Sequence, residues 1–397
     1  MKRIYYIDWL RIIAIAGVFV FHNAHFFDPI YWHVKNPQQN EQVLLFLGFM
    51  NLWIMPLFFF LSGGSALFGL KKPFHRYLKG KTLRLLVPFI IGVLFLIPPQ
   101  KYVEGLSNGA YTGSFPAFLS VYFGGEIFNH GFGFNPVWIG IISYHLWFLG
   151  HLFLISLLSF GILKYLNNNG EQIFRFFNRI TSIRGSVLLM FLPVALVRIL
   201  LRKQFPEYTG WCDFAVYFLY FLYGFMFTHN EGLKLNLLRS RYPALITGIV
   251  LYVVYILSFR FEGSLLKNLF HNNSVTAWYM FQETAGALAT WSWLVFITAE
   301  GIRYLNSDHS LREPLNEAVL PFYILHQTVV LLIGFQVVQW NWPAWYKFGF
   351  IAGVSLFIII TIYMLAIRPF NTMRFAFGMN KMKINYFNQG GKNHESK

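Results

Sequence analysis

The stretch DWLRIIAIAGVFVFHN, residues 8–23, is apolar enough to cross a bilayer, yet it contains an arginine, Arg11, and a histidine, His22. Ionisable residues at membrane depth are rare and usually serve a function. Eleven residues make about three helical turns, so the two side chains lie on nearly the same face, about 16 Å apart along the axis. The spacing predicts a membrane helix with one functional group near each end.

The composition extends this prediction to the whole chain. Its 397 residues are 56% hydrophobic and only 12% charged, about half the charged share of a soluble domain. We expect an all-α, polytopic transmembrane helical bundle in one membrane domain over residues 1–380, followed by a polar, basic and disordered tail over 381–397. About ten spans are predicted, and they begin near Ile7, Val43, Leu85, Val137, Val187, Phe214, Tyr242, Val275, Ala318 and Trp345.

The distribution of Lys and Arg among the loops predicts the orientation of the chain in the membrane. If the ten spans alternate in direction, one side of the membrane holds 23 of the 32 Lys and Arg and the other side holds eight. The positive-inside rule then puts both termini in the cytoplasm of a multi-pass protein of the cell (plasma or inner) membrane. The basic residues lie in short loops and no nucleic-acid motif is present, so no nucleic-acid partner is expected despite the net charge of +16.

In this orientation Arg11 lies near the cytoplasmic boundary, and His22 lies about 8 Å below the outer end of the first helix. A histidine can take a proton from a hydroxyl and return it to a leaving group. An anionic donor held by Arg11 could therefore react at His22 with an acceptor that enters from outside. Two other interpretations remain open: Arg11 as a snorkelling side chain that contributes to topology, and His22 as a helix-packing histidine.

A basic run follows the second predicted span. Residues 71–84 (KKPFHRYLKGKTLR) contain six Lys and Arg, a density that suits phosphate groups as well as lipid headgroups. Arginine is favoured for bidentate phosphate contacts, so Arg76 and Arg84, with Lys81 beside them, are the candidate ligands of an anionic co-substrate. Positive-inside topology alone also accounts for such a run.

Other polar residues lie inside predicted spans. Glu283 is a carboxylate well inside one of them and needs a cationic or proton-sharing partner, either His22 or another residue. With His22 and Arg11 it completes the set of candidate catalytic residues. His145 could line the same cavity as His22, whereas His326 is predicted to make an interhelical hydrogen bond. No closed set of metal ligands is apparent, and no metal site is expected.

Five blocks in order resemble the acyltransferase 3 family of integral membrane acyltransferases, in particular its glucan biosynthesis protein C-like branch. They are RIIAIAGVFVFH with Arg11 and His22, then FFFLSG, LRLLVPF, HLWFL and YILHQ. The resemblance covers most of the chain. The chain departs from it in having lysines in the basic run where relatives often have arginine.

The resemblance implies O-acyl transfer from cytoplasmic acyl-coenzyme A, a co-substrate and not a permanently bound cofactor, to a hydroxyl of an extracytoplasmic glycan. His22 would be the essential residue. The branch implies a succinyl group and a glucan, while acetyl donors also occur in the family. The sequence does not separate a base role of His22 from a transient acyl-histidine.

Two functions of other classes remain open on the sequence. The first is a transporter or flippase for a glycan or an anionic metabolite, with Arg11, His22 and Glu283 lining a passage. The second is an accessory membrane subunit of a glycan-assembly complex, without chemistry of its own. Turnover of an acyl thioester would distinguish the predicted enzyme from both.

Overall fold

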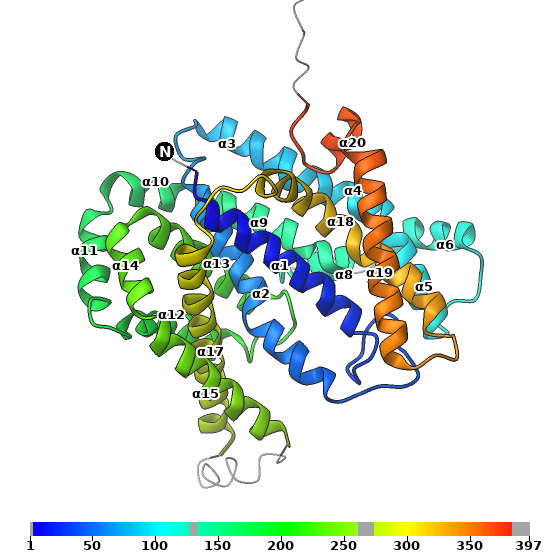
Figure 1. The fold of residues 1–397 in the computed structure, drawn as a ribbon, viewed down its shortest axis with the longest axis horizontal. Coiled ribbons are helices and arrows are strands. Elements are labelled where there is room, and N and C mark those ends of the chain that lie inside the picture. The colour runs from blue at the N-terminus through cyan, green and yellow to red at the C-terminus, as the bar shows by residue number, and fades with distance from the viewer. Residues whose placement is uncertain (1–2, 127–133, 261–273, 383–397) are drawn as a thin grey trace, which may run out of the picture.

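The structure is a computed structural model that describes residues 3–126, 134–260 and 274–382. Every regular element within these ranges is helical, which confirms the all-α prediction (Figure 1). The first half contains α1 Tyr5–Ala24, α2 Val43–Ala66, α3 Phe74–Lys81, α4 Val87–Phe95, α5 Ile97–Ser107, α6 Phe115–Val121, α8 Val137–Ser143, α9 Trp147–Leu158, α10 Phe160–Asn169 and α11 Glu171–Ile180. The second half contains α12 Phe191–Leu201, α13 Trp211–His229, α14 Glu231–Arg239, α15 Arg241–Arg260, α17 Ser274–Tyr304, α18 Arg312–Val337, α19 Ala344–Ile362 and α20 Asn371–Ala376.

Within the described ranges, seven helices are long and apolar enough to cross a membrane, and nine spans result if two bent helix pairs each count as one. The bent pairs are Phe74–Phe95 with Ile97–Ser107, at 40°, and Glu231–Arg239 with Arg241–Val254, at 56°. The span predicted near Val187 is a shorter apolar helix, Ser186–Leu201. The bundle is therefore polytopic, with seven to nine spans by length and composition. Of the predicted tail, residues 383–397 lie outside the described residues.

Proline marks the start of several helices. Pro73 and Pro343 directly precede α3 and α19, while Pro88, Pro98 and Pro116 lie in the first turns of α4, α5 and α6. Proline is tolerated there because a first-turn N–H has no partner inside the helix. The same property separates α4 from α5, since Pro98 cannot continue the hydrogen-bond ladder of the preceding helix.

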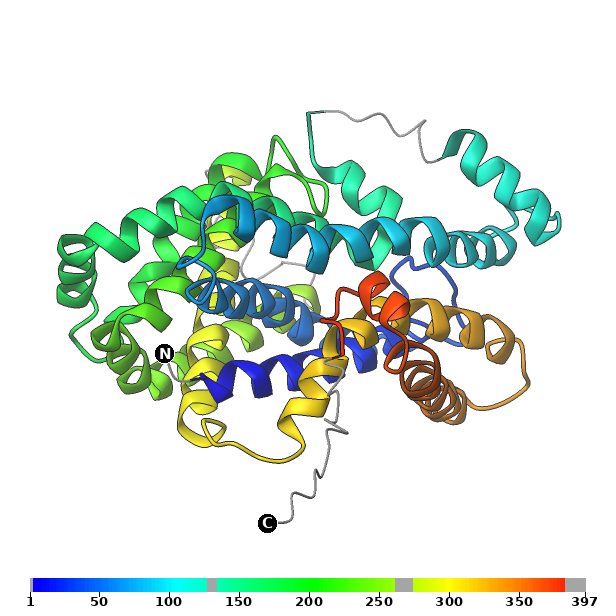
Figure 2. The ribbon, with the colours of Figure 1, turned by 90° about the horizontal axis from the view of Figure 1, so that it is seen from above.

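Helices α1 and α18 run parallel and in register. Arg312 Nη1 donates to Asp8 Oδ2 at 2.8 Å, and His22 Nδ1 lies 2.7 Å from His326 Nε2. The two contacts are 14 residues apart on both helices, which corresponds to about 21 Å along each axis. Seen from above, α1 and α2 lie between the green helices α13 to α15 and the orange-to-red α19 and α20 (Figure 2).

Glycines allow α2 and α13 to approach closely. A Cβ atom at Gly63 would lie 1.8 Å from the carbonyl oxygen of Phe221, and one at Gly64 would lie 2.5 Å from Thr228 Oγ1 and 3.3 Å from Ile7 Cδ1. Small residues permit such helix contacts in membranes. The C-terminal ends of α2 and α13 therefore meet beside the start of α1, so these two helices run parallel to each other and opposite to α1.

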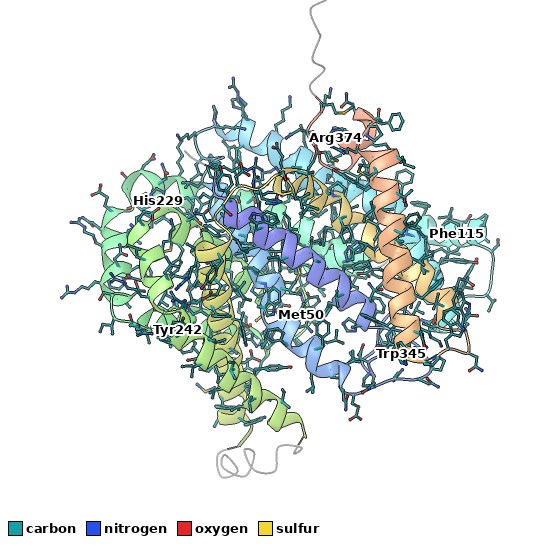
Figure 3. The ribbon with its side chains drawn as sticks, viewed as in Figure 1. Met50, Phe115, His229, Tyr242, Trp345 and Arg374 are labelled. Atoms are coloured by element: carbon teal, nitrogen blue, oxygen red, sulfur yellow. The ribbon has the colours of Figure 1, made fainter. Side chains whose placement is uncertain are left out.

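The two ends of the bundle carry different side chains. Arg374 lies at the upper end in Figure 3, where it forms an ion pair with Glu317. Trp345 lies at the lower end of α19, beside the exposed rings of Trp342 and Tyr346. Tryptophan and tyrosine rings are typical of the membrane–water interface.

Candidate active site

The site is centred on two histidines from neighbouring helices. His22 lies in the last turn of α1, and its Nδ1 is 2.7 Å from Nε2 of His326, near the middle of α18. The two ring planes differ by 6°, and their centroids are 4.9 Å apart. The interhelical hydrogen bond predicted for His326 is therefore confirmed, and its partner is His22.

The contacts of His326 assign the protons of both rings. Its Nδ1 lies 2.6 Å from the carbonyl oxygen of Tyr323. A carbonyl oxygen only accepts, so this Nδ1 carries the proton and Nε2 of the neutral ring accepts from His22 Nδ1. Neutral His22 then has an unprotonated Nε2, which has no hydrogen-bond partner within the described part of the chain. This nitrogen is available to receive a proton.

His145 lies beside the pair because the span around it is broken. Tyr144 has a φ of +47°, which ends α8 and begins a short 3₁₀ turn before α9. The buried ring of His145 contacts the ring of His326 edge to face, with centroids 5.1 Å apart. Its Nε2 donates to the carbonyl oxygen of Ile324 at 3.2 Å, and the hydroxyl of Tyr323 donates to the His145 carbonyl. Three histidines thus meet near one end of α1.

Arg11 lies at the other end of α1, fixed by α2. Its Nη2 donates to Ser65 Oγ at 2.7 Å and to the carbonyl oxygen of Leu61 at 3.2 Å. Lys81 and Arg84 are close enough to repel Arg11 electrostatically. These three predicted residues therefore form one cation cluster, which suits an anion with several negative charges.

The backbone around the basic run is irregular. Arg84 lies in a π-helical turn, Thr82–Leu86, between α3 and α4. Pro88 has no N–H to donate to the Arg84 carbonyl, and π-turns of this kind often occur at functional sites. Of the predicted phosphate ligands, Arg76 on α3 and Arg84 are both exposed, whereas Lys81 is half-buried.

Glu283 pairs with an arginine and not with His22. Arg198 Nε on α12 donates to Glu283 Oε2 on α17 at 2.6 Å. This contact corrects the suggested pairing with His22, and the physical reason is that a permanently charged guanidinium is a better partner than a neutral imidazole for a carboxylate at membrane depth. Arg198 stands inside the predicted fifth span, so the sequence already contained the second ionisable group of this pair.

A tryptophan outside the predicted set of site residues lies over His22. Trp32 belongs to the loop between α1 and α2, and its ring centroid is 6.1 Å from that of His22, with the planes at 22°. The loop gives no periodic signal, and only its aromatic content could have indicated such a contact.

Comparison with known proteins gives the family of the chain. Residues 4–364 match the acyltransferase 3 family, which is described as an acyltransferase domain. The glucans biosynthesis protein C of Escherichia coli (strain K12) is 24% identical over 383 residues, covering 91% of this chain and 90% of the relative. The protein of the same name from Shigella dysenteriae serotype 1 is 25% identical with the same coverage. No solved structure matches the chain.

The match includes both ends of the site, since Arg11 and His22 and their partners Ser65 and His326 all lie within the matched residues. Because the matched residues form most of the chain, this protein belongs to the acyltransferase 3 family and is a membrane enzyme that transfers acyl groups other than amino-acyl groups.

Proposed function

We propose that the protein moves a succinyl or acetyl group from cytoplasmic acyl-coenzyme A to a hydroxyl of an extracytoplasmic glucan or related glycan, with His22 as catalytic base. The observation that carries the proposal is the hydrogen-bond chain from the Tyr323 carbonyl through His326 to His22, which leaves Nε2 of His22 unprotonated. The glucan acceptor is supported by the name of the relatives.

The chemistry of the proposed step balances without a further reactant. Nε2 of His22 takes the proton of a sugar hydroxyl as the hydroxyl oxygen forms a bond to the thioester carbonyl carbon. The carbon–sulfur bond then breaks, and the same nitrogen returns the proton to the sulfur that leaves. The products are a sugar ester and coenzyme A. In the alternative route, Nε2 attacks the thioester carbonyl carbon and coenzyme A leaves as its thiolate. The sugar hydroxyl then attacks the acyl-histidine, its proton passes to the thiolate, and the C–N bond breaks to release the ester and free His22.

His326 would act on His22 during this step. When His22 is protonated, its Nδ1–H continues to donate to His326 Nε2, so part of the positive charge is stabilised without movement of either ring. His326 is thus a positioning residue in this proposal, because it contacts the base and not the substrate.

The cation cluster of Arg11, Lys81 and Arg84 would bind the phosphates of acyl-coenzyme A, with Arg76 at its surface. Arg11 and His22 are eleven residues apart on one helix, about 16 Å along its axis. That distance is of the order of the pantetheine arm, which joins the phosphates of coenzyme A to the thioester. The donor would therefore bind with its nucleotide at the cytoplasmic end and its acyl group at His22.

For the topology we propose ten spans in one membrane domain, residues 1–380, with both termini and the tail 381–397 in the cytoplasm of the cell membrane. The parallel pairs support this count. Helices α1 and α18 are parallel, as are α2 and α13, so an odd number of spans must separate the members of each pair. If each bent pair is one span, the number of spans between the members of each parallel pair is odd only when the shorter helix Ser186–Leu201 is also counted as a span.

The decisive experiment is turnover of labelled acyl-coenzyme A by purified protein in nanodiscs, with a gluco-oligosaccharide as acceptor. We expect wild type to form the sugar ester and His22→Ala to lose this activity. His309→Ala, which removes an exposed histidine in the loop before α18, is the matched control and should retain it. Wild-type turnover by His22→Ala would refute the base role.

The same assay tests the alternatives, because a transporter or an accessory subunit would leave the thioester intact in wild type as well. Mass analysis of surface glycans from cells with and without the protein would then identify the acyl group from the lost mass increment. A protein that turns over no thioester and whose removal leaves the glycan masses unchanged would contradict the proposed function.

A further inference from the structure

The loop between α1 and α2 folds back over the end of α1 and brings an aromatic row to His22. Trp32 lies with its ring 6.1 Å from that of His22, and its other neighbours include His25 at 5.5 Å. His33, the next residue, stacks on Tyr144 with ring centroids 4.3 Å apart. A continuous row of rings therefore runs from His22 through Trp32 and His33 to Tyr144.

Glu104 of α5 holds this row in place. Its carboxylate accepts hydrogen bonds from the hydroxyls of Tyr31 and Tyr144, and it lies 3.1 Å from Nδ1 of His33. These contacts join the loop, α5 and the break before α9. Aromatic rings fixed in this way lose little conformational entropy when a ligand stacks on them.

The charges beside the row are paired within the protein. Asp28 is buried and accepts from Lys35 and from His25, each at 2.9 Å. Burial opposes ionisation of Asp28, but the hydrogen bonds from His25 and Lys35 outweigh it and lower the pKa of the carboxyl below its ordinary value. Since Asp28 and Glu104 both have cationic or donor partners, these rings are suited to a neutral ligand.

One buried acceptor beside the row lacks a partner. Nε2 of His145 donates to the carbonyl of Ile324, so its Nδ1 carries a lone pair. That atom is buried and has no hydrogen-bond partner in the part of the chain that the structure describes, while the residue as a whole is only 7% exposed. Buried polar groups in native proteins are almost always paired. The unpaired Nδ1 of His145 can therefore accept a hydrogen bond from a hydroxyl of a ligand bound beside His22.

The backbone beside this acceptor is strained. Tyr144 has a φ of +47°, in the region that favours glycine, and its hydroxyl is tied to Glu104. Strain of this kind is held in place by surrounding contacts and is concentrated at ligand sites. Here it breaks the span and brings His145 to the ring of His326.

We propose that the aromatic row and His145 form the acceptor subsite, and that it binds one neutral hexose unit. The apolar C–H face of the sugar stacks on Trp32, its reacting hydroxyl donates to Nε2 of His22, and a neighbouring hydroxyl donates to Nδ1 of His145. The role given to His22 rests on the proposed function. The stacking and the contact with His145 concern binding alone.

The test is equilibrium binding of a neutral gluco-oligosaccharide to the full-length protein in nanodiscs, measured by calorimetry without any acyl donor. We expect Trp32→Leu to weaken binding at least tenfold, and His145→Phe to weaken it about fivefold or more. The matched control is Trp342→Leu, which removes an exposed ring at the same end of the bundle and should bind as wild type does. Melting temperatures establish that each variant is folded.

Each outcome bears on the subsite. Wild-type affinity of a folded Trp32→Leu or His145→Phe variant would overturn it, as would equal loss of binding in Trp342→Leu. If Trp32→Leu does not fold, His145→Phe and the milder Trp32→Tyr decide in its place. Tighter binding of the same oligosaccharide oxidised to carry carboxylates would overturn the assignment of a neutral sugar.

The subsite and the proposed function can fail separately. Sugar binding that depends on Trp32, in a protein that turns over no thioester, would retain the subsite and refute the proposed acyl transfer. Acyl transfer to a glucan by wild type, together with unchanged sugar affinity of Trp32→Leu, would refute the subsite alone.

Discussion

Replacement of His326 tests whether a second histidine holds the base in its active form. Leucine at this position has a similar size but cannot accept the hydrogen bond from His22 Nδ1. Glutamine can do so, because its amide oxygen accepts from His22 while its amide nitrogen donates to the carbonyl of Tyr323, the two contacts that His326 makes. The pair His326→Leu and His326→Gln therefore separates loss of the hydrogen bond from loss of the imidazole.

The expected magnitude follows from the lost contact. A buried donor left without its acceptor costs about 1–3 kcal/mol, and a loss of this size in the transition state corresponds to about a 5- to 150-fold decrease in kcat. We expect His326→Leu to fall in this range and His326→Gln to stay within a few-fold of wild type. The KM for acyl-coenzyme A should change little, since the cation cluster at Arg11 lies about 16 Å away along α1.

The assay is ester formation at saturating acyl-coenzyme A and oligosaccharide, normalised to folded protein by size-exclusion chromatography. A His326→Leu variant with wild-type kcat would refute the positioning role. So would a His326→Gln variant as slow as His326→Leu at equal melting temperature, because the defect would then depend on the imidazole itself and not on its acceptor.

Three further changes test the structure. Gly63→Ala should lower the melting temperature in nanodiscs, because the added Cβ would lie 1.8 Å from the Phe221 carbonyl oxygen. Overpacking of this kind typically costs about 1–3 kcal/mol. An unchanged melting temperature would contradict the close contact between α2 and α13. Glu283→Gln should also destabilise the protein, because Arg198 would keep its charge without a counter-charge; full stability with lost turnover would instead place Glu283 in the catalytic site. Asp28 has a pKa below its ordinary value of 3.8, so its stabilisation is present above about pH 4 and is lost as the pH falls through the lower folded-state pKa. Asp28→Asn should reduce the acid dependence of a thermal-melting series and leave the part due to other paired carboxylates such as Glu104; an acid dependence equal to that of wild type would contradict this.

Much of the fold follows from windows of sequence about twenty residues long. A membrane span is a local property, because every backbone group in it is satisfied within the helix and its composition is set by the lipid around it. Helices such as α1, α2 and α19 were therefore predicted to begin within two residues of their observed first residues. The spans that were hardest to delimit are short ones, such as those near Leu85, where Pro98 interrupts the helix, and near Val187, where the apolar helix is only Ser186–Leu201.

The partners of the site residues could not be predicted in the same way. His22 and His326 are 304 residues apart in the chain, and their contact depends on how α1 and α18 are placed along each other. One clue was present in the sequence, since Asp8 precedes His22 by the same 14 residues by which Arg312 precedes His326. The loop that carries Trp32 offered no such regularity, because its conformation depends on a contact with Glu104 of α5, 73 residues further along the chain than its partner Tyr31.

In the proposed function, the register of α1 and α18 would let two polar residues of one helix act on one donor. The ion pair Arg312–Asp8 anchors the first turn of α1, and the histidine pair anchors its last turn. Between them the rise of the helix, and not a flexible loop, sets the distance from Arg11 to His22. A donor bound through its phosphates would thus meet the base only if its arm spans that distance. Binding energy gained at the cation cluster would then position the thioester for reaction near the opposite side of the membrane.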